Sequence, residues 1–246
     1  MSEILVIREK DNFTRVLIER GYSVVNFPTI ETKALTDLSE LDDILARIET
    51  FDGIFITSLT AAKIVLAKLS ETKKNFNGKF YVLGKRSGDL LKKYAYEIFF
   101  DEKATTAKEL LEAIPKEELK NKKFLFPCGN RSLRIVPETL RNIAEVFETV
   151  VYRTTEIETD ETKWLEIKEK FERGKIEAIC FFSPSGAEEF LKKFDGFSQG
   201  EVTIAAIGQT TARSIEENNL RVDFISAAST AKDFATDLIE HLRNRN

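Results

Sequence analysis

The sequence has very few of the residues that build metal sites or histidine-based catalysis. Only one histidine, His241, and two cysteines, Cys128 and Cys180, occur among 246 residues. Because the cysteines lie apart in apolar runs, we expect buried free thiols rather than a disulfide. With so few ligand types no zinc site is recognisable, so no metal is expected. An enzyme built from this chain must work with hydroxyls, carboxylates, amides, Lys, Arg or Tyr.

Long apolar runs and an excess of positive charge are also lacking. No stretch approaches the roughly 18 apolar residues of a membrane span, and the run at 4–7 is too short for a secretory signal. The formal net charge is −4, so the chain has no general attraction to nucleic acid or anionic lipid. We therefore expect a cytoplasmic protein that captures any anionic ligand through a few placed groups.

What the sequence does contain is a regular alternation of short apolar runs and amphipathic segments. Most runs are continuously apolar, which favours strands covered on both faces and hence parallel sheets in an α/β fold. The predicted strands are 4–7, 23–27, 53–57, 80–84, 97–100, 123–126, 148–152, 178–182, 203–208 and 221–225.

The second half of the chain repeats the first. "GIFITSLTAAKIV" at 53–65 matches "AICFFSPSGAEEF" at 178–190 with an offset of 125 residues, and Gly84 matches Gly208 with an offset of 124, both close to half the chain length. The repeat predicts two similar doubly wound parallel-sheet domains. Two such domains facing each other would leave a cleft, which is a common place for a ligand.

Small hydroxyl-bearing loops follow the predicted strands in both halves, each just before a helical pattern. Helix capping explains each one separately, because a serine or threonine oxygen accepts the free amide protons of a first turn. An anion site is the second interpretation, because a helix start presents N–H groups and a positive dipole end. Both interpretations stay open for Ser58, Ser87, Ser183, Ser185, Thr210 and Thr211, and Gly186 in the 183–186 loop is a further candidate for the anion site.

Several motifs occur in an order that resembles the uroporphyrinogen-III synthase family. They are "ITS" (56–58) followed by Ala61-Ala62, "FLFPCGN" (124–130), "VYRT" (151–154), "FFSPSG" (181–186) and "IAAIGQTTA" (204–212). The resemblance covers essentially the whole chain. This chain departs from the family pattern at the first loop, where many bacterial members have Arg then Pro and this chain has Arg8-Glu9-Lys10.

The resemblance implies two interleaved α/β domains. Domain one would comprise 1–32 and 155–246, and domain two 33–154. A two-stranded β-ladder of 26–35 with 151–158 would join them, and the Thr and Glu residues there suit a solvated ribbon. The internal repeat alone would instead divide the chain near residue 121.

The resemblance also implies an activity. Members of the family are cofactor-independent lyases that cyclise hydroxymethylbilane, a linear tetrapyrrole, with inversion of ring D and loss of water. Tyr152 resembles the family's tyrosine and would assist departure of the hydroxyl, although a strand-end tyrosine also serves simply as a packing residue. The substrate would be bound by the strand-end residues named above together with Arg8. We expect a monomer without nucleic-acid or membrane partners, in at most transient contact with the preceding pathway enzyme.

A non-enzymatic module is the alternative function. A two-lobed binding or sensor protein for a polycarboxylate ligand would have the same α/β pattern and the same hydroxyl-rich loops. Response regulators fit less well because they need an acidic cluster at the strand ends, and flavodoxins because they need a phosphate loop after the first strand.

Overall fold

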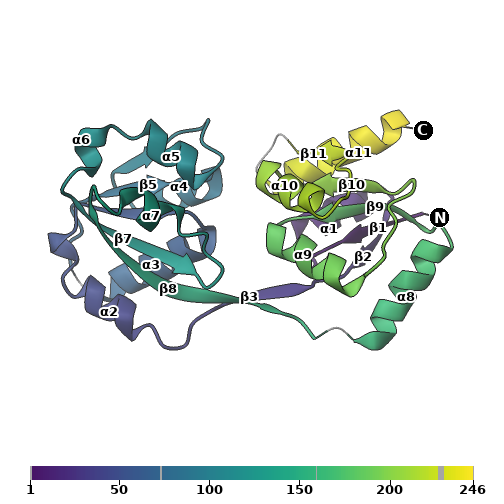
Figure 1. Ribbon diagram of the computed structural model, residues 1–246, viewed down its shortest axis with the longest axis horizontal. Helices are drawn as coiled ribbons and strands as arrows, with labels where there is room; N and C mark the ends of the chain where they lie inside the picture. The colour runs from purple at the N-terminus through teal and green to yellow at the C-terminus, as the bar shows by residue number, and fades with distance from the viewer. Residues whose placement is uncertain (1, 73, 159, 227–229, 246) are drawn as a thin grey trace. The chain divides into compact units, whose positions relative to one another are not determined.

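The fold is given by a computed structural model that describes residues 2–72, 74–158, 160–226 and 230–245 (Figure 1). The chain folds into two compact units. Unit 1 comprises Met1–Glu31 and Thr155–Asn246, and unit 2 comprises Thr32–Thr154. Each unit contains a sheet with helices on both faces, so the prediction of an α/β fold with parallel sheets is confirmed.

The sheet of unit 1 has five parallel strands in the order β11-β10-β9-β1-β2. These strands are β1 (Glu3–Val6), β2 (Ser23–Asn26), β9 (Ile176–Phe181), β10 (Thr203–Ala206) and β11 (Phe224–Ile225). Helices α1 (Asn12–Glu19) and α11 (Ala231–Arg245) cover one face. The other face is covered by α8 (Glu161–Glu172), α9 (Pro184–Lys193) and α10 (Gln209–Glu217).

Strand β1 shows why the predicted strands are apolar at every position. Ile4 and Val6 pack against α1 and α11, whereas Leu5 packs in the cluster that contains α9 and α10. All three side chains are fully buried. Successive side chains of a strand point to opposite faces, so a sheet covered on both faces buries all of them.

The sheet of unit 2 has six strands in the order β3-β8-β7-β4-β5-β6. They are β3 (Ile30–Ala34), β4 (Gly53–Ile56), β5 (Lys79–Val82), β6 (Ile98–Phe100), β7 (Lys123–Gly129) and β8 (Glu145–Glu156). One face carries α2 (Ser39–Leu45), α3 (Leu59–Thr72), α4 (Lys85–Lys92) and the 3₁₀ helix η1 (Ile48–Thr50). The opposite face carries α5 (Ala107–Ala113), α6 (Lys116–Leu119) and α7 (Ile135–Leu140).

Strands β3 and β8 form an antiparallel pair at the edge of this sheet. Leu35 N donates to Val151 O at 3.0 Å, and the Thr32 and Thr154 hydroxyls lie 2.9 Å apart. The partner number falls as the residue number rises, which is the register of antiparallel strands. Each of these strands carries the chain past a boundary between the two units.

All ten predicted strands overlap a strand of the structure, but β7 extends beyond its predicted end at 126. It continues through Pro127 to Gly129. Strand β7 pairs with β4 only at Phe124 and Leu125, so its remaining residues pair with β8 alone. A proline is tolerated where one side of a strand needs no N–H donor.

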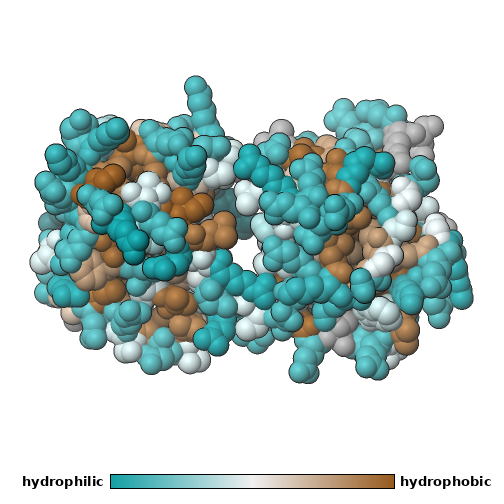
Figure 2. Space-filling view, viewed as in Figure 1, coloured by the Kyte–Doolittle hydropathy of each residue, from teal (hydrophilic) through white to brown (hydrophobic). Residues whose placement is uncertain are grey.

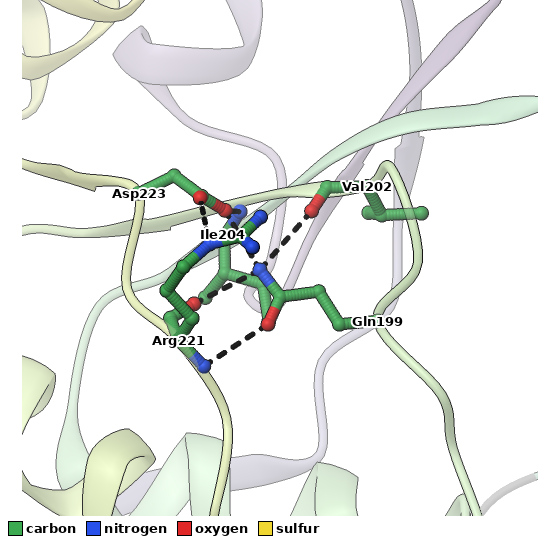
Figure 3. A network of polar contacts seen from close by, with 5 residues as sticks. All are labelled: Gln199, Val202, Ile204, Arg221 and Asp223. Carbon is green, nitrogen blue, oxygen red and sulfur yellow. Dashed lines mark hydrogen bonds and ion pairs between the residues drawn. The ribbon is translucent and has the colours of Figure 1, made fainter.

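A polar network closes the amino end of the unit 1 sheet (Figure 3). The Gln199 side chain accepts from Arg221 N at 3.0 Å and donates to Asp223 Oδ2 at 2.7 Å. Asp223 Oδ2 also accepts from Ile204 N at 2.9 Å. The hydrogen-bonding groups of these residues are paired with one another, so we interpret the network as structural.

Polar and charged side chains cover most of the visible surface, with apolar side chains showing between them (Figure 2). The exposed large apolar residues lie in different elements, for example Ile18 in α1, Tyr94 after α4 and Leu165 in α8. No helix within the described ranges is long and apolar enough to span a bilayer.

The matched glycines Gly84 and Gly208 have different backbone conformations. Both precede a helix as its N-cap, α4 and α10 respectively. Gly84 has φ +87° and ψ 128°, which side chains rarely permit, whereas Gly208 is extended with φ −179°. A Cβ at either position would have no atom within 4 Å. Only Gly84 therefore needs to be glycine, and the reason is its backbone alone.

We expect alanine at these two positions to have opposite outcomes. Gly84→Ala should lower the free energy of unfolding by about 1–3 kcal/mol, the usual range for a residue held in a disfavoured backbone region. Gly208→Ala should leave it within about 0.5 kcal/mol of wild type, because it introduces neither strain nor a clash. Urea denaturation of both variants tests this, and equal effects would contradict it.

Candidate functional site

Each sheet has one position where the order of its strands reverses. In unit 1 it lies between β1 and β9, and in unit 2 between β7 and β4. Open parallel sheets bind ligands beyond the carboxyl ends of the strands at such a point. The loops that follow these strands begin near Arg8, Ser183, Asn130 and Ser58. Two candidate regions result, one in each unit.

In unit 1, the loop between β9 and α9 is held by internal hydrogen bonds. Ser183 is the N-cap of α9, and its Oγ accepts from Gly186 N at 3.1 Å. The Ser185 hydroxyl lies 3.5 Å from that of Ser183. The carbonyl of Gly186 accepts from Thr29 Oγ1 at 3.0 Å. Both backbone groups of Gly186 are thus bonded within the protein.

Arg8 lies beside the same loop, at the carboxyl end of β1. Its guanidinium carbon is 4.4 Å from the centre of the Phe182 ring, and its Nη2 is 3.2 Å from Asp11 Oδ2. About a third of the side chain is exposed. A guanidinium has five N–H donors, so pairing with Asp11 is compatible with binding an anion as well.

Ser87 and Thr211 occupy equivalent positions in the two units, and neither is an N-cap. Each is the third residue of its helix, α4 or α10. The N-cap of each helix is a glycine, which has no side chain to bond the first amides. The capping interpretation is therefore wrong for these two residues. Ser87 is 3% and Thr211 4% exposed, and neither hydroxyl bonds to another residue in the described part of the chain. Thr210, one position earlier in α10, is exposed.

Ser58 follows β4 in unit 2 and caps α3. Its Oγ accepts from Ala61 N at 3.0 Å, and the side chain is half-buried. Capping is thus confirmed for Ser58 and Ser183. A capping hydroxyl still has a donor proton and a second lone pair, so binding of an additional anion is compatible with capping.

Tyr152 is placed by a β-bulge in β8. Cys128 pairs with Val150 but the next residue of β7, Gly129, pairs with Tyr152, so one residue of β8 is extra. Bulges re-aim side chains and occur often next to active sites. The half-buried Tyr152 ring packs with the cluster that contains α3 and α4.

The hydroxyl of Tyr152 differs from that of the buried Tyr81. Tyr81 donates to Glu118 Oε2 at 3.1 Å, and its pKa is raised by burial and by that carboxylate. Among the described residues, none accepts a hydrogen bond from the Tyr152 hydroxyl and none donates one to it. The Tyr152 phenol thus differs from that of Tyr81 in that its hydroxyl is bonded to no other described residue.

The two cysteines are free and buried, as expected. Burial and the nearby Glu148 carboxylate raise the pKa of the Cys128 thiol to about 11, so little thiolate forms at neutral pH. Burial also raises the pKa of Cys180. In the portion of the chain that the structure describes, no three His, Cys, Asp or Glu side chains gather as metal ligands do.

Comparison with known proteins assigns the family. The model of the family described as uroporphyrinogen-III synthase HemD matches residues 11–236. The chain belongs to the uroporphyrinogen-III synthase family. It is 30% identical to the uroporphyrinogen-III synthase of Chlorobaculum parvum over 253 aligned positions, which cover 99% of this chain and all of that protein. A Proteus mirabilis uroporphyrinogen-III synthase is 25% identical over 134 residues, 53% of this chain and 67% of that protein.

Solved structures of the same family share the fold. A mutant uroporphyrinogen III synthase from Thermus thermophilus superposes with a TM-score of 0.72 at 15% identity, over the full length of both chains. The Helicobacter pylori protein gives 0.62 at 18% identity, over 99% of this chain and all of the other. At these identities the superpositions show the fold alone.

Three residues at these edges escaped the analysis of the sequence. Gly129 and Asn130 lie within the motif "FLFPCGN", of which only the cysteine was considered. Both contact Tyr152, and that contact depends on the register of β7 against β8. Buried Thr29 holds Gly186 from far away in the sequence, and no sequence pattern signals that hydrogen bond.

Proposed function

We propose that this protein converts hydroxymethylbilane to uroporphyrinogen III, closing the macrocycle with inversion of ring D and loss of water. The observation that carries the proposal is the family match over residues 11–236. Two further features support it. The hydroxyl of Tyr152 is not bonded to another described residue, and hydroxyl-bearing helix starts line the carboxyl edge of each sheet.

The hydroxyls and helix starts suit the carboxylates of the substrate. Hydroxymethylbilane carries eight carboxylate side chains, and amide or hydroxyl donors at a helix start bind such groups well. The N-caps of helices α4 and α10 are glycines, so no side chain of the N-cap competes for their first amides. We assign carboxylate binding to Ser58, Ser87, Ser183, Ser185, Thr210, Thr211 and Arg8. Gly186 would contribute by shaping its loop, because both its backbone groups are already bonded.

Tyr152 is assigned the proton or hydrogen-bond donor for the departing hydroxyl. A phenol is an effective donor at neutral pH. When the hydroxyl leaves as water, the electron-rich pyrrole stabilises the resulting azafulvene cation. The substituted carbon of ring D then attacks this cation, and a spiro intermediate allows ring D to invert. Positioning of the bilane by the protein, rather than a strong acid or base, would account for most of the rate enhancement.

The architecture leads to a related proposal about domains. We take 1–32 with 155–246 and 33–154 as two interleaved copies of one α/β domain, linked by the β3–β8 ladder. The strand orders support this. When strands are matched by the sequence repeat, the order β6-β5-β4-β7-β8 in unit 2 is equivalent to the order β11-β10-β9-β1-β2 in unit 1. A cytoplasmic monomer, with transient contact to the preceding pathway enzyme, completes the proposal.

Turnover and binding assays together test the proposed function against a binding or sensor module. Hydroxymethylbilane is generated in a coupled assay, and its consumption is followed with and without the protein. Uroporphyrinogen III is titrated separately. The proposal requires faster consumption with the protein present. Saturable binding of uroporphyrinogen III without any acceleration would instead establish the binding module.

A further inference from the structure

The Tyr152 ring rests directly on the backbone of Gly129. A Cβ built at Gly129 would lie 2.5 Å from Tyr152 Cζ and 2.9 Å from its Oη, and closer still to Cε2. Real Cβ atoms do not come so near to other atoms. The φ of Gly129 is not in the left-handed region, so its backbone does not call for glycine. What excludes a side chain at this position is therefore the phenol.

Asn130 holds the strand that carries Tyr152. Its backbone N donates to Tyr152 O at 3.3 Å. Its side chain accepts from Thr154 N at 2.7 Å and donates to Thr154 O at 3.2 Å. The amide of Asn130 thus bonds both backbone groups of Thr154, as a neighbouring strand would. These bonds fix β8 to the end of β7 just after the bulge.

We infer that Gly129 and Asn130 are positioning residues for the Tyr152 phenol, an inference that rests on the proposed function. Gly129 leaves the space in which the ring lies, and Asn130 fixes the bulged strand that directs the ring there. A phenol that must donate to a departing hydroxyl needs a defined place, and displacement by about 1 Å can cost about 100-fold in rate. Neither residue is assigned a contact with substrate.

Gly129→Ala is the primary test. We expect kcat to fall about 10- to 100-fold with KM within about twofold of wild type, because carboxylate binding elsewhere is untouched. The same substitution in a Tyr152→Ala background should cause no further loss of kcat, because the ring that it displaces is gone. An additive loss in that background would overturn the inference.

Gly53→Ala is the matched control for lost stability. Gly53 is also a strand glycine of unit 2, and a Cβ there would lie 2.7 Å from Cε2 of Tyr81 and 2.8 Å from Lys79 O. This variant should melt at a lower temperature but keep the kcat of its folded fraction. If Gly129→Ala does not fold, Asn130→Ala replaces it, with the same expected fall in kcat at unchanged KM.

An NMR measurement tests the positioning without relying on activity. The chain has five tyrosines, so ring-¹³C-labelled tyrosine gives few resonances, and the one that Tyr152→Phe removes is that of Tyr152. Gly129→Ala should shift this resonance more than the other four. An unshifted Tyr152 resonance, or a kcat equal to wild type, would refute the positioning role. Failure of the wild type to turn over the bilane would instead refute the proposed function. In that case the Tyr152 resonance would still report whether Gly129→Ala displaces the ring.

Discussion

Tyr152→Phe is expected to lower kcat about 10- to 1,000-fold, a range that spans a lost hydrogen bond and a lost general acid. The ring should still pack on Gly129, and no hydrogen bond to a described residue is lost, so the melting temperature should be unchanged. Some activity should remain, because the bilane ionises readily and the protein still folds it. The product should remain the type III isomer, since ring inversion depends on positioning.

Tyr81→Phe is the control for this prediction. The Tyr81 hydroxyl donates to Glu118 within unit 2 and has no part in the proposed chemistry. Its removal should lower stability and leave kcat unchanged. Steady-state kinetics and thermal melts of both variants decide between the roles. Unchanged turnover in Tyr152→Phe, or a rate that falls only because the protein unfolds, would make Tyr152 a packing residue.

Thr211→Val is expected to raise KM about tenfold with little effect on folding. The substitution keeps the shape of the side chain and removes only a hydroxyl that bonds to no other described residue. If that hydroxyl donates to a substrate carboxylate, the loss is that of a hydrogen bond to a charged group, roughly 1.5 kcal/mol or more. The initial rate over a range of bilane concentrations measures the change.

Thr149→Val is the control for Thr211→Val, and we expect it to have the opposite effects. Thr149 is as buried as Thr211, but its hydroxyl donates to Glu40 Oε2 at 2.7 Å. Its loss should lower the melting temperature and leave KM unchanged. An unaltered KM in Thr211→Val would remove Thr211 from the set of carboxylate ligands.

The strands and the capping serines were predictable because their signals are local. A strand buried on both faces is apolar at each position, as in 4–6, and that pattern is visible without a structure. Ser58 and Ser183 precede helical patterns and cap them, as serines in that place usually do. Local physics sufficed for these features.

Other features depend on contacts that no local pattern contains. The compact units divide at 31/32 and 154/155 because β1 pairs with β9, a strand from the other half of the chain. The bulge at Val151 exists only in the register of β8 against β7, so the contact of Tyr152 with Gly129 could not be foreseen. Likewise, capping stayed open as an interpretation of Ser87 and Thr211, because the sequence does not show that the glycines three residues earlier occupy the N-cap position.

The isomer composition of the product tests the central claim most directly. Hydroxymethylbilane is closed with and without the protein, the products are oxidised, and the porphyrins are separated by chromatography. Uncatalysed closure gives the type I isomer, because nothing then inverts ring D. Predominantly type III product in the presence of the protein is the predicted result. A composition indistinguishable from the protein-free control would contradict the proposed function.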